Sequence, residues 1–479
     1  MSESNSPRQY RSEWAVVVIV ATLLAVLASF LPSWRWVPTL SVILVYGAAY
    51  AFLLRVPNEG VVTLTATHLF AAIYTLYIAI PALLAFLLIH TPVVGGPPDL
   101  PVGRILVFSL LGFLALVAGS LCGYFLVRAH RPSLLPRYRE RALECRLDIN
   151  AWFPLFVVTA LGIAGTVFFF WSHRRDYLAL LVAQQIGGQR SELRAGSGYL
   201  TMNFVYILPW MCVLTYLAGR ARGQRRMLIV ALLIGGSAFL AQAALLYRGN
   251  IVFFFILLLV ASQAVQMKVS ADIVKWSVPA IVFFVAATAV RLGTGAGTDH
   301  LLQSVGTKIL ARFITPIRQL GYILDTFPRH GFFPGKTYLL DVSALLPGAQ
   351  RSFNGIIYQE MGGAGFGSAT ITILGESYAN FGGAGIVLVP FVIGALLQLM
   401  HHRLLRSRKT AVGVLLYSLL TVYSAKAVLA GLTANLLQPV GVFLAFALPT
   451  LVVAHVLRMS AFGRGAGTGS HPLPQQRST

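Results

Sequence analysis

The sequence is poor in charged residues, which make up 11% of its 479 positions, whereas soluble domains carry about 25%. Among the charged residues the acidic ones are the minority, with 15 Asp and Glu against 37 Lys and Arg. Hydrophobic residues form 57% of the chain. So few charges cannot cover so much apolar side chain in water, so the composition excludes a soluble fold and favours a lipid bilayer.

Cysteine is rare as well, with Cys122, Cys145 and Cys212 and no CxxC pair, which argues against a disulfide framework or a zinc site. The sequence has no P-loop, no H-E-x-x-H helix and no G-x-S-x-G elbow. No Asp-x-Asp motif occurs in the segments that we expect outside the membrane. We therefore expect neither a bound metal nor a cofactor.

Long apolar runs recur along the chain, and a membrane-spanning helix needs about 20 such residues. The predicted fold is an all-α, polytopic integral membrane protein with about 12 transmembrane helices and two long external loops. The predicted spans are 14–31, 37–54, 68–89, 105–127, 152–171, 200–219, 227–246, 251–266, 273–290, 383–400, 411–429 and 436–457.

The formal net charge of +22 lies in short clusters between the apolar runs rather than in one basic domain. That distribution is typical of membrane topology signals and of contact with anionic headgroups, and it argues against a nucleic-acid partner. With the N-terminus inside, 22 of the Lys and Arg residues fall on the cytoplasmic side and 14 outside, while Lys426 falls within a span. The positive-inside rule thus predicts that both termini are cytoplasmic.

The two long loops divide the chain. Residues 1–290 hold spans one to nine and include the external loop 172–199. Residues 291–382 form the second external loop, whose Gly and Pro content predicts compact irregular structure with short helices. Residues 383–457 hold the last three spans, and the polar segment 458–479 is predicted to be a disordered cytoplasmic tail.

Several arginines fall on the predicted outer side, where few basic residues are expected. Arg248 lies in a tight turn between two spans, Arg291 ends span nine, and Arg312 and Arg318 follow in the second loop. An arginine at the membrane surface can simply snorkel toward the headgroups. It can also grip a phosphate with two parallel hydrogen bonds, which makes all four candidates for an anion site.

Three polar residues interrupt the apolar approach to span ten: Glu376, Tyr378 and Asn380. They either form the wet face of an interfacial helix or place a carboxylate at the outer membrane face, where it could act as a base or orient an arginine. Lys426, within span eleven, needs a polar partner or a water-filled cavity.

The order of these features resembles that of bacterial O-antigen (Wzy-type) oligosaccharide repeat-unit polymerases. The shared pattern is an Arg-Gly turn at 248–249, an arginine closing a span at Arg291, and a long external loop with the Pro-Gly turns 334–335 and 347–348. A Gly-Glu-Ser-Tyr-Ala-Asn-Phe-Gly-Gly stretch at 375–383 then precedes a late span.

The resemblance implies a metal-independent glycosyltransferase of the bacterial cytoplasmic (inner) membrane. It would polymerise polyprenyl-pyrophosphate-linked oligosaccharides at the outer face into O-antigen, capsule or exopolysaccharide. Arg248, Arg291, Arg318 and Glu376 would then be catalytic, and Arg312, Tyr378 and Asn380 would bind substrate. The implied protein partners are a chain-length regulator and a flippase, besides membrane lipid.

Two alternatives stay open. A glycan ligase would use the same lipid-linked donor and need the same charges. A flippase or other transporter would show inverted repeats and polar residues at mid-bilayer. Lys426 is the strong mid-span charge, and no repeat is evident, so the pattern favours chemistry at one membrane face.

Overall fold

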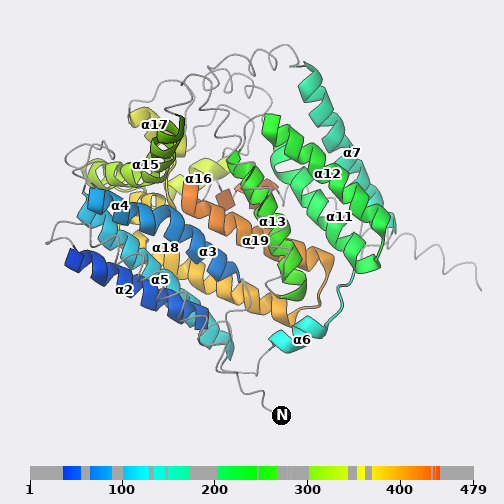
Figure 1. The fold of residues 1–479 in the computed structure, drawn as a ribbon, viewed down its shortest axis with the longest axis horizontal. Helices are drawn as coiled ribbons and strands as arrows, with labels where there is room; N and C mark the ends of the chain where they lie inside the picture. Colours follow the sequence, from blue (N-terminus) through cyan, green and yellow to red (C-terminus); the bar gives the residue numbers. More distant parts are fainter. Residues whose placement is uncertain are drawn as a thin grey trace, which may run out of the picture.

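The computed structural model describes residues 36–55, 65–88, 101–128, 134–145, 149–172, 202–244, 248–267, 278, 282, 301–343, 353–361, 369–432, 435–436 and 438–442. Within them the chain is helical and contains no strand, only an isolated bridge between Glu144 and Thr410. The longer helices are α2 (Trp36–Arg55), α5 (Val102–Arg128), α7 (Ile149–Ser172), α11 (Leu208–Arg222), α12 (Arg225–Ala244), α13 (Arg248–Gln266), α15 (Leu301–His330), α18 (Ile373–Arg406) and α19 (Ala411–Ala430) (Figure 1). The shorter ones are α3 (Ala66–Tyr74), α4 (Ile80–Leu88), α6 (Leu135–Glu140), α16 (Lys336–Ser343), α17 (Phe353–Glu360) and α20 (Gln438–Val442).

Seven helices of the described part are long and apolar enough to cross a membrane. Each coincides with a span predicted from the sequence, and α2 and α7 coincide with two more predicted spans. The predicted spans 14–31, 273–290 and 436–457 lie wholly or largely outside the described residues, so the total of about 12 stays a prediction, as do the loop 172–199 and the tail 458–479.

Two spans contain a short π-helical segment that ends just before a proline, with one residue between. The π-helical segments η1 (Thr75–Ala79) and η2 (Asn203–Ile207) precede Pro81 and Pro209. Proline has no N–H for the helical ladder and its ring crowds the preceding turn. A π turn, which bonds each N–H to the fifth carbonyl back, lets the helix continue past that defect.

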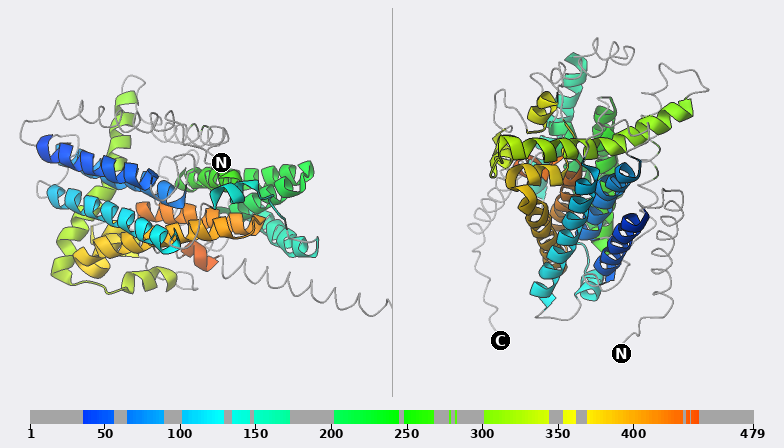
Figure 2. Two further views of the ribbon diagram at one scale, coloured as in Figure 1. Left: turned by 90° about the horizontal axis from the view of Figure 1, so that it is seen from below. Right: turned by 90° about the vertical axis from the view of Figure 1, so that its left-hand side faces the viewer.

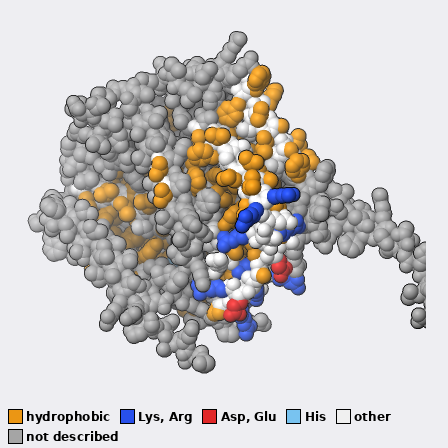
Figure 3. Space-filling model, turned by 45° about the vertical axis from the view of Figure 1, so that its right-hand side comes forward, with side chains coloured by type: hydrophobic (Ala, Val, Ile, Leu, Met, Phe, Trp, Pro, Cys, Tyr) orange, Lys and Arg blue, Asp and Glu red, His pale blue; other side chains and the backbone are white. Residues whose placement is uncertain are grey.

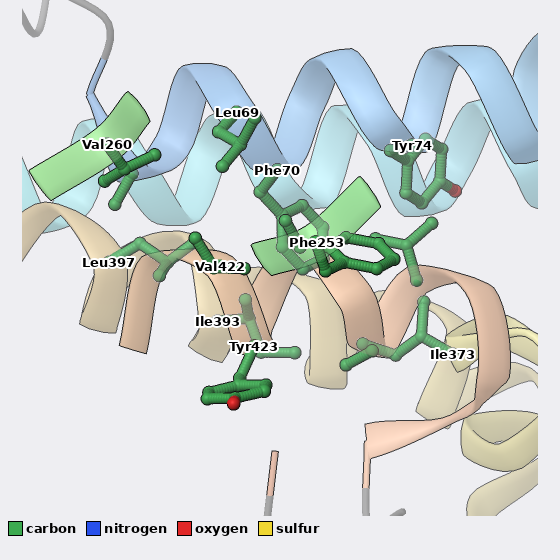
Figure 4. Packing of buried hydrophobic residues seen from close by; sticks show 14 of the residues in the cluster. Leu69, Phe70, Tyr74, Phe253, Val260, Ile373, Ile393, Leu397, Val422 and Tyr423 are labelled. Atoms are coloured by element: carbon green, nitrogen blue, oxygen red, sulfur yellow. The ribbon is translucent and has the colours of Figure 1, made fainter. Parts of the chain in front are cut away.

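Apolar side chains fill the core and also lie on the outer surface of several helices. In the core, α3, α13, α18 and α19 pack through Phe70, Phe253, Ile393 and Val422 (Figure 4). On the surface, α7 and α12 leave large apolar side chains exposed, including Phe156, Leu161, Phe168, Trp171, Leu232, Leu233 and Leu240. Figure 3 shows such side chains gathered over one part of the surface, with the Lys and Arg side chains gathered apart from them. An exposed apolar surface of this extent is expected of helices that face lipid.

Helices α5 and α18 touch backbone to backbone because glycines line their contact. A Cβ on Gly119 would lie 1.9 Å from the carbonyl oxygen of Phe391, and one on Gly394 would lie 2.2 Å from that of Leu116. Small residues that allow such an approach are typical of packed transmembrane helices. This contact fixes α18, which carries the polar residues described below.

One end of the bundle is basic and is held together by α6; we call it the α6 end. Arg141 donates to the backbone carbonyls of Leu405, Arg406 and Ser407, at the C-terminus of α18. Arg139 donates to the Met267 carbonyl at the end of α13. The α11–α12 turn points the same way (Figure 1). The described basic residues of these turns are Arg137, Arg139, Arg141, Arg220, Arg222, Arg225, Arg226, Arg403, Arg406, Arg408 and Lys409, all of which were predicted to be cytoplasmic.

At the opposite end, which we call the α16 end, α15, α16 and α17 lie over the ends of the spans (Figures 1 and 2). The sequence predicted short helices here, but α15 runs for 30 residues with Pro316 and Pro328 inside it. Its buried residues recur every three or four positions, at Ile314, Ile317, Leu320, Ile323, Leu324 and Phe327. This amphipathic spacing outweighs the local effect of the prolines.

Candidate functional site at the α16 end

Glu376 is buried in the first turns of α18, with 1% of its surface exposed. The helix begins at Ile373 under a Thr372 cap, ten residues before the start predicted for span ten. Ser377, Tyr378 and Asn380 are buried with it. The interpretation of this stretch as an interfacial helix with a wet polar face is therefore wrong, because α16, α19 and α5 cover it.

The Glu376 carboxylate is held by the segment that follows α19. Its Oε2 accepts a hydrogen bond from the backbone N–H of Leu432. Gly431 precedes that amide with φ +82, and a Cβ there would lie 2.7 Å from Oε2. A glycine is thus required both for the backbone conformation and for the approach of the carboxylate.

Asn380 lies one turn after Glu376 and joins α18 to α16. Its Nδ2 donates to Thr337 Oγ1 at 2.5 Å and to the Glu376 carbonyl at 2.9 Å. Its Oδ1 accepts from the Thr337 backbone N–H. A further bond from the Phe333 N–H to the Ala379 carbonyl secures the chain just before α16. Asn380 therefore positions α16 over the start of α18, and it is not itself exposed to solvent.

Tyr338, the next residue on α16, brings a hydroxyl toward the same carboxylate. Burial raises the pKa of Tyr338 above its ordinary value, and the charge of Glu376 raises it further. The phenol therefore stays protonated at neutral pH and is available as a hydrogen-bond donor beside a buried carboxylate. Tyr338 could not be predicted from the sequence, because nothing near it along the chain links it to residue 376.

Tyr378 faces away from this group and meets α5. Its hydroxyl accepts a hydrogen bond from Arg104 Nη2 at 3.2 Å, and its ring packs against those of Phe108 and Phe332. Arg104 is exposed at the start of α5, with its guanidinium 5.7 Å from the Phe108 ring centre. The structure thus adds an arginine at the α16 end that the sequence analysis did not select.

The structure describes the side chain of only one of the four predicted arginines, Arg318. Arg248 is the first residue of α13 and Arg312 lies within α15, but their side chains, like all of Arg291, are outside the described residues. Arg318 is half-buried on α15, the helix whose Ile323 lies against Gly375 of α18.

Lys426 connects the start of α13 to the end of α19. Its Nζ donates to Asn250 Oδ1 at 2.7 Å, which provides the polar partner that a charge within a span was predicted to need. Asn250 is two residues after Arg248, and Lys426 is six residues before the amide that binds Glu376. The backbone of Arg248 therefore lies at the same end of the bundle as Glu376.

The structure thus gathers Glu376, Asn380, Tyr378 and the elements that carry Arg248 and Arg318 at one end. Among the predicted site residues, the described contacts link Glu376 directly to Asn380. Tyr378 belongs to a neighbouring contact with Arg104 on the other face of α18. This end of the bundle thus combines a buried carboxylate and a buried phenol with elements that carry arginines.

A second buried polar cluster lies toward the α6 end and was not selected from the sequence. Gln398 Oε1 accepts from Thr67 and Ser120, and His401 contacts the Tyr417 hydroxyl, to which the Ala66 N–H also donates. His68 is buried and closes a capping box with Thr65 at the start of α3. These contacts join α3 to α18 and α19, so we interpret the cluster as structural.

Among the described residues, no group of three His, Cys, Asp or Glu side chains could hold a metal ion. Comparison with protein-family models, curated proteins and solved structures gives no match to the chain. The functional proposal therefore depends on the residues themselves and on the resemblance noted above.

Proposed function

We propose that the protein is an oligosaccharide repeat-unit polymerase of the cytoplasmic membrane, and that its chemistry occurs at the α16 end. The observation that carries this proposal is the buried Glu376, held at that end among elements that bring arginines. Burying a carboxylate within a membrane protein is costly, which is why Glu376 is our candidate for the reacting carboxylate.

The chemistry needs two things that these residues can supply. Transfer of a glycan from a polyprenyl pyrophosphate leaves a pyrophosphate, whose charge arginines stabilise through paired hydrogen bonds. The accepting sugar hydroxyl must lose a proton, and a buried carboxylate such as Glu376 can accept it or orient an arginine. Arg248, Arg291 and Arg318 are assigned to the pyrophosphate, and Arg312, Tyr378 and Asn380 to substrate binding or to support of the site.

A glycan ligase remains the second candidate, because it would use the same donor and the same charges. Purified protein supplied with carrier-linked repeat units and no other acceptor distinguishes the two. A polymerase makes a ladder of products from these units alone, whereas a ligase makes none.

Metal chelation provides a further prediction for the same assay. Since arginines are proposed to neutralise the leaving group, ladder formation should proceed at an unchanged rate in EDTA. A loss of activity that a divalent ion restores would contradict arginine-based stabilisation.

The proposal also needs the α16 end to face outward. We expect Lys336→Cys, exposed at the start of α16, to react with a membrane-impermeant maleimide in intact cells. Gln224→Cys, exposed in the α11–α12 turn, should react only after permeabilisation. Both are made in a background without Cys122, Cys145 and Cys212, and the reverse labelling pattern would invert the topology.

A further inference from the structure

The turn between α11 and α12 carries four arginines within seven residues, and the proposed reaction uses none of them. They are Arg220, Arg222, Arg225 and Arg226. The sequence has no Asp or Glu from position 193 to position 271, so neither helix of the turn supplies a counter-charge. The carboxylates described at the α6 end, Glu140 and Glu144, belong to α6 and the segment after it.

The turn is tight, which holds its arginines close together. Gly223 has the left-handed conformation that glycine favours, with φ +65, and the N–H of Gln224 donates to the Gly219 carbonyl at 3.0 Å. A Cβ on Gly219 would lie 2.9 Å from that of Met227, because α12 starts directly against the end of α11. The last turn of α11 and the first turn of α12 therefore present their arginines on one short surface.

One of these arginines is fixed in position. Arg220 is half-buried, and its Nη1 donates to the Tyr216 hydroxyl at 3.0 Å, one turn earlier on α11. That bond uses one of the five N–H donors of a guanidinium. The planar fork of a guanidinium matches two oxygens of a phosphate. Arg222, Arg225 and Arg226 are exposed in the same turn, so the surface has the charge and the donors that an anionic group requires.

An exposed apolar face of α12 begins beside these arginines. Of the seven membrane-length helices in the described part, α12 is the least buried, at 33%. Its side chains Ile229, Leu232 and Leu233 are exposed by 59%, 71% and 67%. On this side of the molecule the apolar and the basic side chains form adjoining areas (Figure 3). The combination of a basic turn and a bare apolar face is the pattern that an anionic lipid matches.

The dimensions agree with one leaflet of a bilayer. At a rise of 1.5 Å per residue, Leu233 lies about 10 Å along α12 from Arg226. One leaflet supplies about 15 Å of hydrocarbon, half of the roughly 30 Å core. A lipid whose phosphate meets the arginines would therefore place its acyl chains along the exposed face of α12.

We propose that the α11–α12 turn binds the phosphate of an anionic phospholipid of the phosphatidylglycerol type, whose acyl chains lie along the exposed face of α12. The arginines select an anionic lipid over a zwitterionic one, because the phosphate of phosphatidylcholine is already neutralised by its own ammonium. The apolar face selects a lipid over a free phosphate ion. The inference goes beyond the proposed function, because it concerns the α6 end and involves no glycan carrier.

Lipid binding to the purified, full-length protein is measured by native mass spectrometry, with phosphatidylglycerol and phosphatidylcholine as the two probes. The double variant Arg225→Gln, Arg226→Gln removes two charges and keeps both side chains polar. A basic residue near an anionic lipid contributes several-fold to affinity, so we expect this variant to bind phosphatidylglycerol at least about tenfold more weakly. Its binding of phosphatidylcholine should stay as in the wild type.

The double variant Arg137→Gln, Arg403→Gln is the matched control, because it removes two exposed arginines of the same end that lie outside the turn. It should lose less than about twofold in affinity for phosphatidylglycerol. An equal loss in the two double variants would overturn the proposal, since the lipid would then respond to the general charge of the α6 end. Equal affinity of the wild type for the two lipids would overturn it as well.

Arginine labelling of the wild-type protein gives an independent readout, which holds even if a variant fails to fold. Phosphatidylglycerol should protect Arg225 and Arg226 from phenylglyoxal, as mapped by mass spectrometry, while Arg137 stays reactive. Phosphatidylcholine and inorganic phosphate at the same concentration should protect neither. Protection by inorganic phosphate alone, or none by phosphatidylglycerol, would overturn the proposal. Because no glycan is transferred in these measurements, their failure would leave the polymerase assay unaffected.

Discussion

Glu376→Gln should lower the rate of repeat-unit polymerisation by about 10²-fold or more, the range in which a general acid–base residue contributes. The amide oxygen of glutamine can still accept the Leu432 N–H, so the segment after α19 should stay in place. The substitution therefore removes the negative charge and the proton-accepting capacity while it preserves the packing. The measurement is the initial rate of ladder formation by purified protein.

Glu360→Gln serves as the matched control, because Glu360 is an exposed carboxylate at the end of α17, on the same side of the bundle. It should retain the wild-type rate. A thermal midpoint for Glu376→Gln close to that of the wild type would show that the loss is chemical. Normal ladders from folded Glu376→Gln protein would remove Glu376 from the site.

Gly119→Ala should strongly destabilise the protein. The added Cβ would lie 1.9 Å from the Phe391 carbonyl oxygen, which belongs to the backbone of α18 and cannot rotate away. Overpacking usually costs about 1–3 kcal/mol, and we expect a loss at or above the top of that range because two helices must separate. The loss is measured as a fall in thermal midpoint and in the yield of monodisperse protein.

Gly236→Ala provides the control for this prediction. Gly236 lies inside α12, and a Cβ there would meet nothing within 4 Å. Since alanine favours a helix by about 1 kcal/mol over glycine, this variant should be as stable as the wild type or slightly more so. If both variants were equally stable, the close contact of α5 with α18 would be wrong.

The sequence predicts the spans well because the signal is local. An apolar run of about 20 residues needs no distant partner to be recognised, and the seven helices of the described part that are long and apolar enough to cross a membrane coincide with such runs. Helix α15 was missed because Pro316 and Pro328 suggest breaks, whereas its buried face becomes evident only from the spacing of apolar residues across them. The start of α18 was placed late because Gly382, at the kink, suggests an end.

The site was harder to predict than the spans. Glu376 could be selected as a lone acid in an apolar stretch, but its burial depends on Leu432 and on α16. Its bond to Leu432 spans 56 residues, and the Asn380–Thr337 bond spans 43. Arg104 meets Tyr378 across 274 residues. No local pattern encodes such pairs, so the sequence singles out Glu376, Asn380 and Tyr378 without predicting what each contacts.

The central claim is that the lipid carrier is bound at the α16 end, and photo-crosslinking tests it most directly. A polyprenyl pyrophosphate carrying a diazirine near its phosphates is irradiated with the purified protein, and the attachment sites are mapped by mass spectrometry. We predict crosslinks in α15, α16 and the first turns of α13 and α18, which excess unlabelled carrier should suppress. Competed crosslinks confined to α6 and the α18–α19 turn would contradict the claim.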